Sequence, residues 1–311
     1  MFFSTIQKWI ALFLSLTAIF SVSAGIPWAD SMAGHDFPVI APAEKAEEDV
    51  RVMSFNIRCT DNNGVPAILR HAIAVRQILK IKPDSFGVQE ATAEWMAALK
   101  TLLPAYACVG VARDNGKSIG GVGEYNAVFY LREKYDLLDH GDFWLSDTPE
   151  TPSIVPGADC RRICTWAKLQ NKETAAIYVH VNSHLDSGSA NARELGAKLI
   201  TDFIGSKFPA STPVVFTADM NAGESSVPYR IMTGSLADAR YAAKDSEGTF
   251  TFHKCFTEDA YPRILDYVMC SDTITVNAFR VVTSGIDGRF VSDHFPLYAD
   301  VFIPGARGSG S

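Results

Sequence analysis

The sequence predicts an α+β fold, a four-layer α/β/β/α sandwich in which two mainly antiparallel sheets pack face to face beneath outer helices. Segments with the apolar or alternating pattern of strands far outnumber helical ones, and amphipathic helices lie between strand pairs in each half of the chain. A sheet buries one face against its partner and needs a second layer over the other. These two observations favour paired sheets with helices outside.

The chain begins with the pattern of a signal peptide. Lys8 precedes an apolar run from Trp9 to Phe20, and small residues follow as far as Ala24. We expect residues 1–24 to be cleaved and the protein to be secreted or periplasmic, with no transmembrane segment in the mature chain. An uncleaved membrane anchor is the alternative. We expect a flexible or loosely docked arm over 25–48, one domain over 49–303 and a disordered tail over 304–311.

The first half of the domain opens with two strand–helix units. Alternation predicts a strand over 49–58, an apolar period of helical type predicts a helix over 67–80, and Lys82-Pro83-Asp84 ends that helix. A strand over 85–90 and a helix over 93–103 repeat the order. Strand patterns then dominate, at 106–112, 126–131, 135–145, 163–169 and 175–184.

The second half is organised around an apolar, β-branched run that ends in polar residues. Val214 to Ala218 reads as a buried strand that delivers Asp219 and Asn221 to the same side as it opens into a loop. A helix over 193–208 precedes it. Further strands are expected at 248–253, 263–270, 273–283 and 297–303.

Charge and cysteine content narrow the classes of function. A net charge of −7 argues against tight passive binding to nucleic acid, which uses many Lys and Arg contacts to phosphate. It does not exclude an enzyme that holds phosphodiesters through a metal. The six cysteines permit up to three disulfides in an exported protein, and their spacing leaves the pairing open.

Polar residues recur where predicted strands end. Residues at strand ends can converge on one rim of a sandwich, whereas scattered surface charges have no reason to, so this recurrence indicates a site. The set is Asn56, Glu90, His184, Asp186, Asp219, Asn221, Asp266, Asp293 and His294.

The segments that contain these residues resemble the ordered motifs of the endonuclease/exonuclease/phosphatase superfamily. The similarity extends from about residue 49 to 303 and follows the superfamily's order. It is carried by Ser54-Phe55-Asn56-Ile57-Arg58, Val88-Gln89-Glu90, Asn182-Ser183-His184-Leu185-Asp186, Thr217-Ala218-Asp219-Met220-Asn221, Leu265-Asp266-Tyr267 and Ser292-Asp293-His294-Phe295-Pro296-Leu297.

The resemblance implies a metal site. Glu90 is expected to be the main Mg²⁺ carboxylate with Asn56 beside it, and Mn²⁺ or Ca²⁺ are alternative ions. Mg²⁺ commonly takes one or two protein carboxylates and keeps several waters. Asp293 is expected either to orient His294 or to contact the metal.

The resemblance also implies catalytic and substrate-binding roles. Asp219 is expected to orient or deprotonate the attacking water, and Asn221 to hold a phosphate oxygen. His294 and His184 are expected to bind the phosphate, with Asp266 paired to His184. Imidazoles and a metal together stabilise the charge of an in-line phosphoryl transition state.

Three further residues are candidates of lower specificity. Tyr125 lies in a segment where some family nucleases place a phosphate-contacting tyrosine, with core packing as the alternative. Arg58 and Arg162 are candidates for contacts to phosphate.

The function expected from the resemblance is hydrolysis of phosphodiester or phosphomonoester bonds by a metal-dependent, monomeric enzyme. Nuclease activity is the first expectation. Phospholipid, sphingomyelin and sugar-phosphate substrates are the alternatives, together with a non-catalytic binding module of the same fold. Because all the central polar residues are present, the enzyme is favoured over the silent module.

Overall fold

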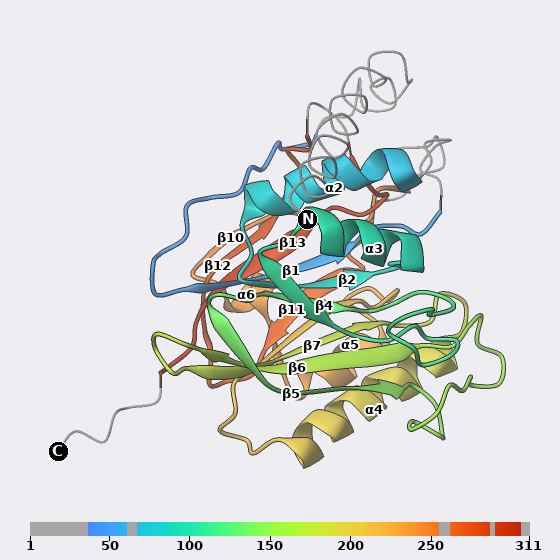
Figure 1. Ribbon diagram of the computed structural model, residues 1–311. Helices are drawn as coiled ribbons and strands as arrows, with labels where there is room; N and C mark the ends of the chain where they lie inside the picture. Colours follow the sequence, from blue (N-terminus) through green and yellow to red (C-terminus); the bar gives the residue numbers. More distant parts are fainter. Residues whose placement is uncertain (1–36, 61–66, 255–261, 287–289, 306–311) are drawn as a thin grey trace, which may run out of the picture.

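The computed structural model describes residues 37–60, 67–254, 262–286 and 290–305, and it confirms the predicted sandwich (Figure 1). One seven-stranded sheet has the order β10-β12-β13-β1-β2-β4-β3. Only β1/β2 and β10/β12 pair in parallel there. Its strands are β1 (Val50–Asn56), β2 (Ser85–Gln89), β3 (Tyr106–Val109), β4 (Val128–Leu131), β10 (Asp245–Glu247), β12 (Thr275–Val281) and β13 (Leu297–Phe302).

The second sheet has six strands in the order β5-β6-β7-β8-β11-β9, with β7 and β8 parallel. Its strands are β5 (Tyr135–Trp144), β6 (Ile163–Asn171), β7 (Ile177–His184), β8 (Val214–Asp219), β9 (Ala237–Asp238) and β11 (Asp266–Cys270).

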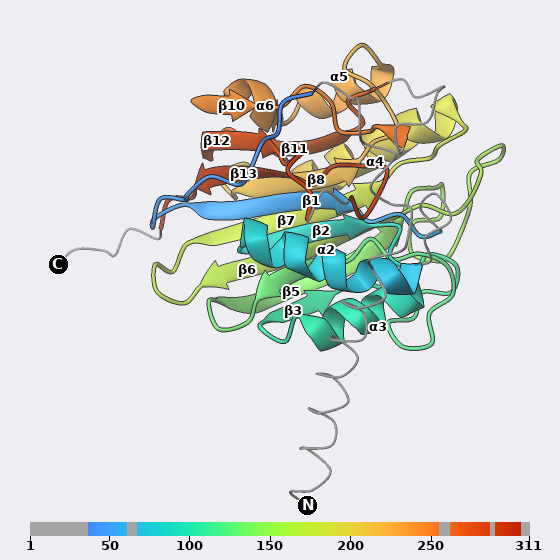
Figure 2. The same cartoon turned by 90° about the horizontal axis from the view of Figure 1, so that it is seen from above.

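Helices cover the outer faces of both sheets. Figures 1 and 2 show α2 (Ala67–Ile81) and α3 (Ala93–Leu102) over the first sheet, while α4 (Ala190–Lys207) and α5 (Val227–Thr233) pack on the second. A short α6 (Ala239–Ala242) follows. The helices α3, α4 and α5 begin at hydroxyl caps, Thr92, Ser189 and Ser226, which accept from backbone N–H groups that the helix leaves unpaired.

The face of β1 between the sheets changes from apolar to polar along the strand. Val50 and Val52 pack into the inter-sheet core, and Ser54 and Asn56 follow them on the same face. Phe55 points the other way and packs under α2 and α3. The inward faces of β2, β7 and β8 also end in polar residues, so the space between the sheets leads to a polar rim.

A buried hydrogen-bond network joins the sheets just behind this rim. Gln89 Nε2 donates to Asn182 Oδ1 over 2.7 Å and to Ser54 Oγ over 3.1 Å. The ring nitrogens of His180 lie 2.9 Å from Ser85 Oγ and 2.8 Å from Thr217 Oγ1. These bonds link β1 and β2 to β7 and β8 and fix the alignment of the two sheets.

Gly87 lets the sheets approach this closely. A Cβ at this position would lie 2.3 Å from both Asn182 Oδ1 and Thr217 Oγ1. Any side chain at position 87 would therefore push the sheets apart or break the network.

The part of the N-terminal arm that the structure describes makes specific contacts with the domain. Ile40 N donates to Thr283 Oγ1 over 2.7 Å, and Ala43 accepts from the buried Arg51 guanidinium over 2.9 Å. Phe37 packs against Phe295, with ring centroids 5.8 Å apart. The expected signal peptide lies outside the described residues, as do residues 306–311 of the expected tail.

Several elements differ from expectation. The short α5, α6, β9 and β10 were not predicted, because elements of two to seven residues show too little periodicity. The prediction of a strand at 248–253 was wrong, because only isolated β-bridges through Phe252 form there. Five cysteines, Cys59, Cys108, Cys160, Cys164 and Cys270, are free thiols, so none of the described cysteines forms a disulfide. Among the described helices, none has the length and apolar character needed to span a bilayer.

Candidate active site

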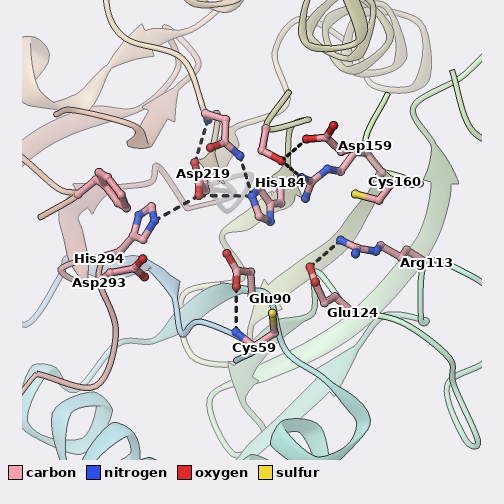
Figure 3. A pocket seen from close by; sticks show the side chains of 14 residues that line it. Cys59, Glu90, Arg113, Glu124, Asp159, Cys160, His184, Asp219, Asp293 and His294 are labelled. Atoms are coloured by element: carbon pink, nitrogen blue, oxygen red, sulfur yellow. Dashed lines mark hydrogen bonds and ion pairs between the residues drawn. The ribbon is translucent and has the colours of Figure 1, made fainter. Parts of the chain in front are cut away.

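A pocket of about 410 Å³ opens at the polar rim of the sandwich (Figure 3). Its lining includes six of the residues expected from the strand-end pattern and the resemblance, and Arg162 as a seventh. The six strand-end residues are Glu90, His184, Asp219, Asn221, Asp293 and His294.

Asp219 lies at the centre of the polar cluster. Asn56 Nδ2 donates to Asp219 Oδ2 over 2.8 Å and to Glu90 Oε1 over 3.0 Å, so one amide joins carboxylates from both sheets. The backbone N–H of Asn221 donates to the other oxygen of Asp219 over 2.8 Å. Asn56 itself is fully buried and reaches the pocket only through the two carboxylates.

His184 is held as a neutral imidazole. The Asn221 amide donates to His184 Nε2 over 2.9 Å and to the Leu185 carbonyl over 3.0 Å, which uses both of its N–H groups. Burial lowers the pKa of His184 well below its usual value, and the positive charges of Arg162 and Arg113 lower it further. Asn221 therefore positions His184 through its amide N–H groups, and only its carbonyl oxygen is left for other contacts.

Asp266 pairs with His294, so the expected pairing with His184 was wrong. His294 Nδ1 lies 2.8 Å from Asp266 Oδ2. The strand order β7-β8-β11 explains the difference: Asp219 on β8 is the register partner of His184 on one side and of Asp266 on the other. Asp266 is thus two strands away from His184, and the loop before β13 brings His294 to it.

The two imidazoles consequently differ in charge. Burial alone would lower the pKa of His294, but the carboxylates of Asp266 and Asp219 overcome it and raise that pKa to about 10. Burial and the charge of Asp266 raise the pKa of Asp219 to about 7, against the opposing effect of His294. The site therefore holds a cationic His294, a neutral His184 and a carboxylate that changes charge near neutral pH.

The donor set fits a divalent cation. Ligand atoms of Glu90, His184 and Asp219 lie within 4.8 Å of one another, and those of Asp219, Asp266 and His294 do the same. Carboxylate and amide oxygens are what Mg²⁺ prefers. Because His294 is held by Asp266, the first group is the better fit to a metal. Asn56, expected beside Glu90 as a ligand, instead turns its N–H groups to the two carboxylates, and its Oδ1 accepts from the backbone N–H of Arg58 over 3.0 Å.

Three site residues have backbone conformations that non-glycine residues rarely adopt. Arg58, Glu90 and Asn221 have φ angles of 58°, 62° and 47°. Such positions cost about 1–3 kcal/mol each and persist only where the surroundings enforce them. At Glu90 the carboxylate is fixed by the backbone N–H of Cys59, which donates to Oε2 over 2.9 Å.

Arg70 of α2 fixes the loop after β1 through hydrogen bonds to its backbone carbonyls. Its fully buried guanidinium donates to the carbonyls of Ile57 and Arg58 over 2.8 Å each, and to that of Val291 over 2.6 Å. One side chain thus ties the Asn56 loop to the segment that carries His294. Nothing in the helical period of 67–80 predicted this role.

Tyr125, Arg58 and Asp186 were expected at the site and are absent from the pocket lining. Tyr125 is buried in the core beneath α2 and α3. Arg58 pairs with Asp293, so Asp293 binds a guanidinium and does not orient His294. Asp186 accepts from the backbone N–H groups of Gly188 and Ser189 and lies 3.7 Å from Arg162 Nε.

Sequence reasoning missed the side of the pocket opposite Asp219. Arg113 and Glu124 come from the β3–β4 loop, Asp159 and Cys160 from the β5–β6 loop, and Ser187 from the loop after β7. Cys59 and Phe252 also line the pocket and were missed. Loop residues carry no periodicity, and only the position of Glu124 beside the Tyr125 motif offered a signal.

Comparison with known proteins identifies the family. Residues 53–294 match the model of the Endonuclease/Exonuclease/phosphatase family. Comparison with curated protein sequences found no match. Among solved structures, an endonuclease/exonuclease/phosphatase from Bacteroides vulgatus is 32% identical, with a TM-score of 0.75 over 82% of this chain and 99% of that one.

Two further structures are similar. A Bacteroides thetaiotaomicron mannosyl-6-phosphatase is 28% identical, with a TM-score of 0.72 over 81% of this chain and 99% of that one. The human Nocturnin catalytic domain, 17% identical with a TM-score of 0.66 over 82% of this chain and 94% of that one, shows the fold alone. The family match covers most of the chain and includes the residues that converge on Asp219. The chain therefore belongs to the endonuclease/exonuclease/phosphatase family.

Proposed function

We propose that this protein is a divalent-metal-dependent phosphoesterase that hydrolyses small phosphate esters. The observation that carries the proposal is the Asp219 carboxylate, which has Asn56, His184 and His294 within 4 Å and shares the Asn56 amide with Glu90. A base, a cationic hydrogen-bond donor and a metal-binding carboxylate are what in-line attack on phosphorus requires.

Each residue has a role in this mechanism. Asp219 takes a proton from water as the water oxygen bonds to phosphorus, the ester P–O bond breaks, and the leaving oxygen takes up a proton from solvent. His294 donates from Nε2 to a phosphoryl oxygen while Asp266 holds Nδ1. A Mg²⁺ ion held by Glu90 beside Asp219 would neutralise phosphoryl charge, with Asn56 fixing both carboxylates through its amide N–H groups.

The pocket lining favours a small ester over a polymer. Five carboxylates line it against two arginines. A polyanion groove needs an excess of Lys and Arg, because affinity for nucleic acid comes mainly from phosphate contacts. The similar mannosyl-6-phosphatase supports a sugar phosphate as the first substrate class to test.

The test is hydrolysis by the purified protein with Mg²⁺, with Mn²⁺ and with chelator. Inorganic phosphate is measured for the monoesters, p-nitrophenol for the nitrophenyl esters, the released head group for the lipid, and gel electrophoresis for DNA. Substrates are p-nitrophenyl phosphate, hexose 6-phosphates, bis-p-nitrophenyl phosphate, phosphatidylcholine vesicles and plasmid DNA. Monoester hydrolysis that chelator and His294→Ala abolish supports the proposal. Cleavage of DNA without phosphate release from the small esters would replace it with a nuclease.

Export of the protein is part of the proposal and rests on the first 24 residues. Mass spectrometry of the protein from whole cells and from the exported fraction tests it. A mature N-terminus at Gly25 is expected. A full-length chain in the membrane fraction would instead show an uncleaved anchor.

A further inference from the structure

The pocket has two sides of different character. Figure 3 shows Asp219 and His294 on one side and Arg113 and Glu124 on the other, with His184 and Glu90 between them. The first side performs the chemistry proposed above. Among the described residues, no hydrogen bond or ion pair joins this second side to Asp219, His294 or Glu90. Its Arg113, Glu124 and Arg162 side chains are charged and at most 15% exposed, whereas Asp159 is exposed.

On this second side each positive charge is matched by a negative one. Arg113 Nη1 lies 2.6 Å from Glu124 Oε2, with both side chains only 15% exposed. Arg162, 8% exposed, donates from Nη2 to Ser187 Oγ over 3.2 Å, and Ser187 donates to Asp159 Oδ2 over 3.0 Å. Paired charges of this kind give little net attraction for a second phosphate.

The two guanidiniums have donors to spare. A guanidinium carries five N–H groups. Within the described part of the chain, the Arg113 side chain uses one of them, on Glu124. Arg162 uses one, on Ser187, and its Nε lies 3.7 Å from Asp186 Oδ2. Buried donors are normally satisfied, so spare ones beside a pocket indicate groups that a ligand completes.

The geometry points to a subsite for a polyhydroxylated leaving group, and we propose that Arg113, Glu124, Asp159 and Arg162 recognise the sugar of a hexose phosphate. This inference rests on the proposed function and deepens it. A hydroxyl both donates and accepts, so neighbouring guanidinium and carboxylate groups satisfy it. A nucleobase would need an aromatic platform, and the only aromatic residue in the described lining, Phe252, packs on His294 with ring centroids 4.8 Å apart.

The test measures selectivity and not activity alone. Values of kcat/KM are compared for glucose 6-phosphate, 2-deoxyglucose 6-phosphate and p-nitrophenyl phosphate in the wild type, Glu124→Gln, Arg113→Gln and the control Arg230→Gln. Arg230 lies on α5, outside the pocket lining, and donates to Ser225 O. Folding of each variant is checked by circular dichroism.

The ratio of sugar-phosphate to p-nitrophenyl phosphate kcat/KM is expected to fall about tenfold or more in both subsite variants, because each loses charge-assisted hydrogen bonds to hydroxyls. Arg230→Gln should keep the wild-type ratio. Ser187→Ala, which breaks the link between Arg162 and Asp159, carries the same test if the first variants do not fold. An unchanged ratio in folded variants overturns the subsite.

The two proposals fail in different ways. If the wild type hydrolyses neither class of ester, the proposed function itself fails. If it hydrolyses p-nitrophenyl phosphate in a chelator-sensitive way but shows no preference for hexose phosphates, the phosphoesterase stands and the sugar subsite is overturned.

Discussion

His294 Nδ1 and Asp266 Oδ2 lie 2.8 Å apart, and both side chains are buried. Because Asp266 is on β11 and His294 precedes β13, this contact connects the two sheets at the pocket. It also keeps His294 cationic, since the carboxylate offsets the cost of burying the charge.

Asp266→Asn should lower the pKa of His294 from about 10, because it removes the largest contribution that raises it. Because activity needs protonated His294, the alkaline limb of the pH profile should move to lower pH. The value of kcat should also fall by about 10²-fold. The pH profile of kcat/KM measures this. The matched control is Asp238→Asn, since Asp238 is a buried carboxylate bound by Tyr229 outside the pocket. An alkaline limb that stays in place would contradict this assignment.

Asp219→Asn should abolish hydrolysis and yet stabilise the protein when metal is removed. The folded-state pKa of Asp219 is raised to about 7, above its usual 3.8, so its effect on stability grows more unfavourable as pH rises from about 4 to 7 and is complete above pH 7. Removing the charge should raise the free energy of unfolding at pH 8 by about 2–4 kcal/mol. Urea denaturation with chelator present, at pH 8 and at pH 4, checks this. The gain should vanish at pH 4, and a loss of stability at pH 8 would refute the burial argument.

Gly87→Ala should destabilise the fold by about 2 kcal/mol or more, because the new Cβ meets Asn182 and Thr217 between the sheets. Thermal unfolding followed by circular dichroism measures the effect. Gly205→Ala in α4 is the control. A Cβ there meets nothing within 4 Å, and the change should stabilise the helix by about 0.5–1 kcal/mol.

His180 should make the protein acid-sensitive. Burial lowers its pKa to about 3, against 6.5 in the unfolded chain, so the unfolded state binds the proton first as pH falls. Its contribution is fully present above pH 6.5 and should decrease by about 3 kcal/mol between pH 6.5 and pH 4. The variant His180→Gln should show a flatter dependence of unfolding free energy on pH. Equal slopes for the two proteins would show that His180 is not the group responsible.

The strands that carry the site were accessible to sequence reasoning because their alternation is strong. β1, β2, β7 and β8 have apolar outward faces, and their inward faces end in polar residues, which is the pattern that pointed to Asn56, Glu90, His184 and Asp219. The resemblance then assigned chemistry to these positions.

What the sequence could not provide was the order of strands and the course of loops. The pairing of Asp266 depends on β11 lying beside β8, which no local pattern encodes. Arg113 and Glu124 meet because two ends of one loop return to the same place. Arg70 lies in an ordinary amphipathic helix, and only the packed structure shows that its guanidinium binds two loops.

The shared amide of Asn56 makes the reacting centre a junction, with Glu90 supplied by one sheet and Asp219 by the other. Catalysis therefore depends on the relative position of the two sheets. A small displacement of one sheet against the other would separate Glu90 from Asp219 and stop turnover while each sheet keeps its secondary structure. Heating should therefore inactivate the enzyme before far-ultraviolet circular dichroism changes, and the interval between the two events measures how firmly the halves are locked together.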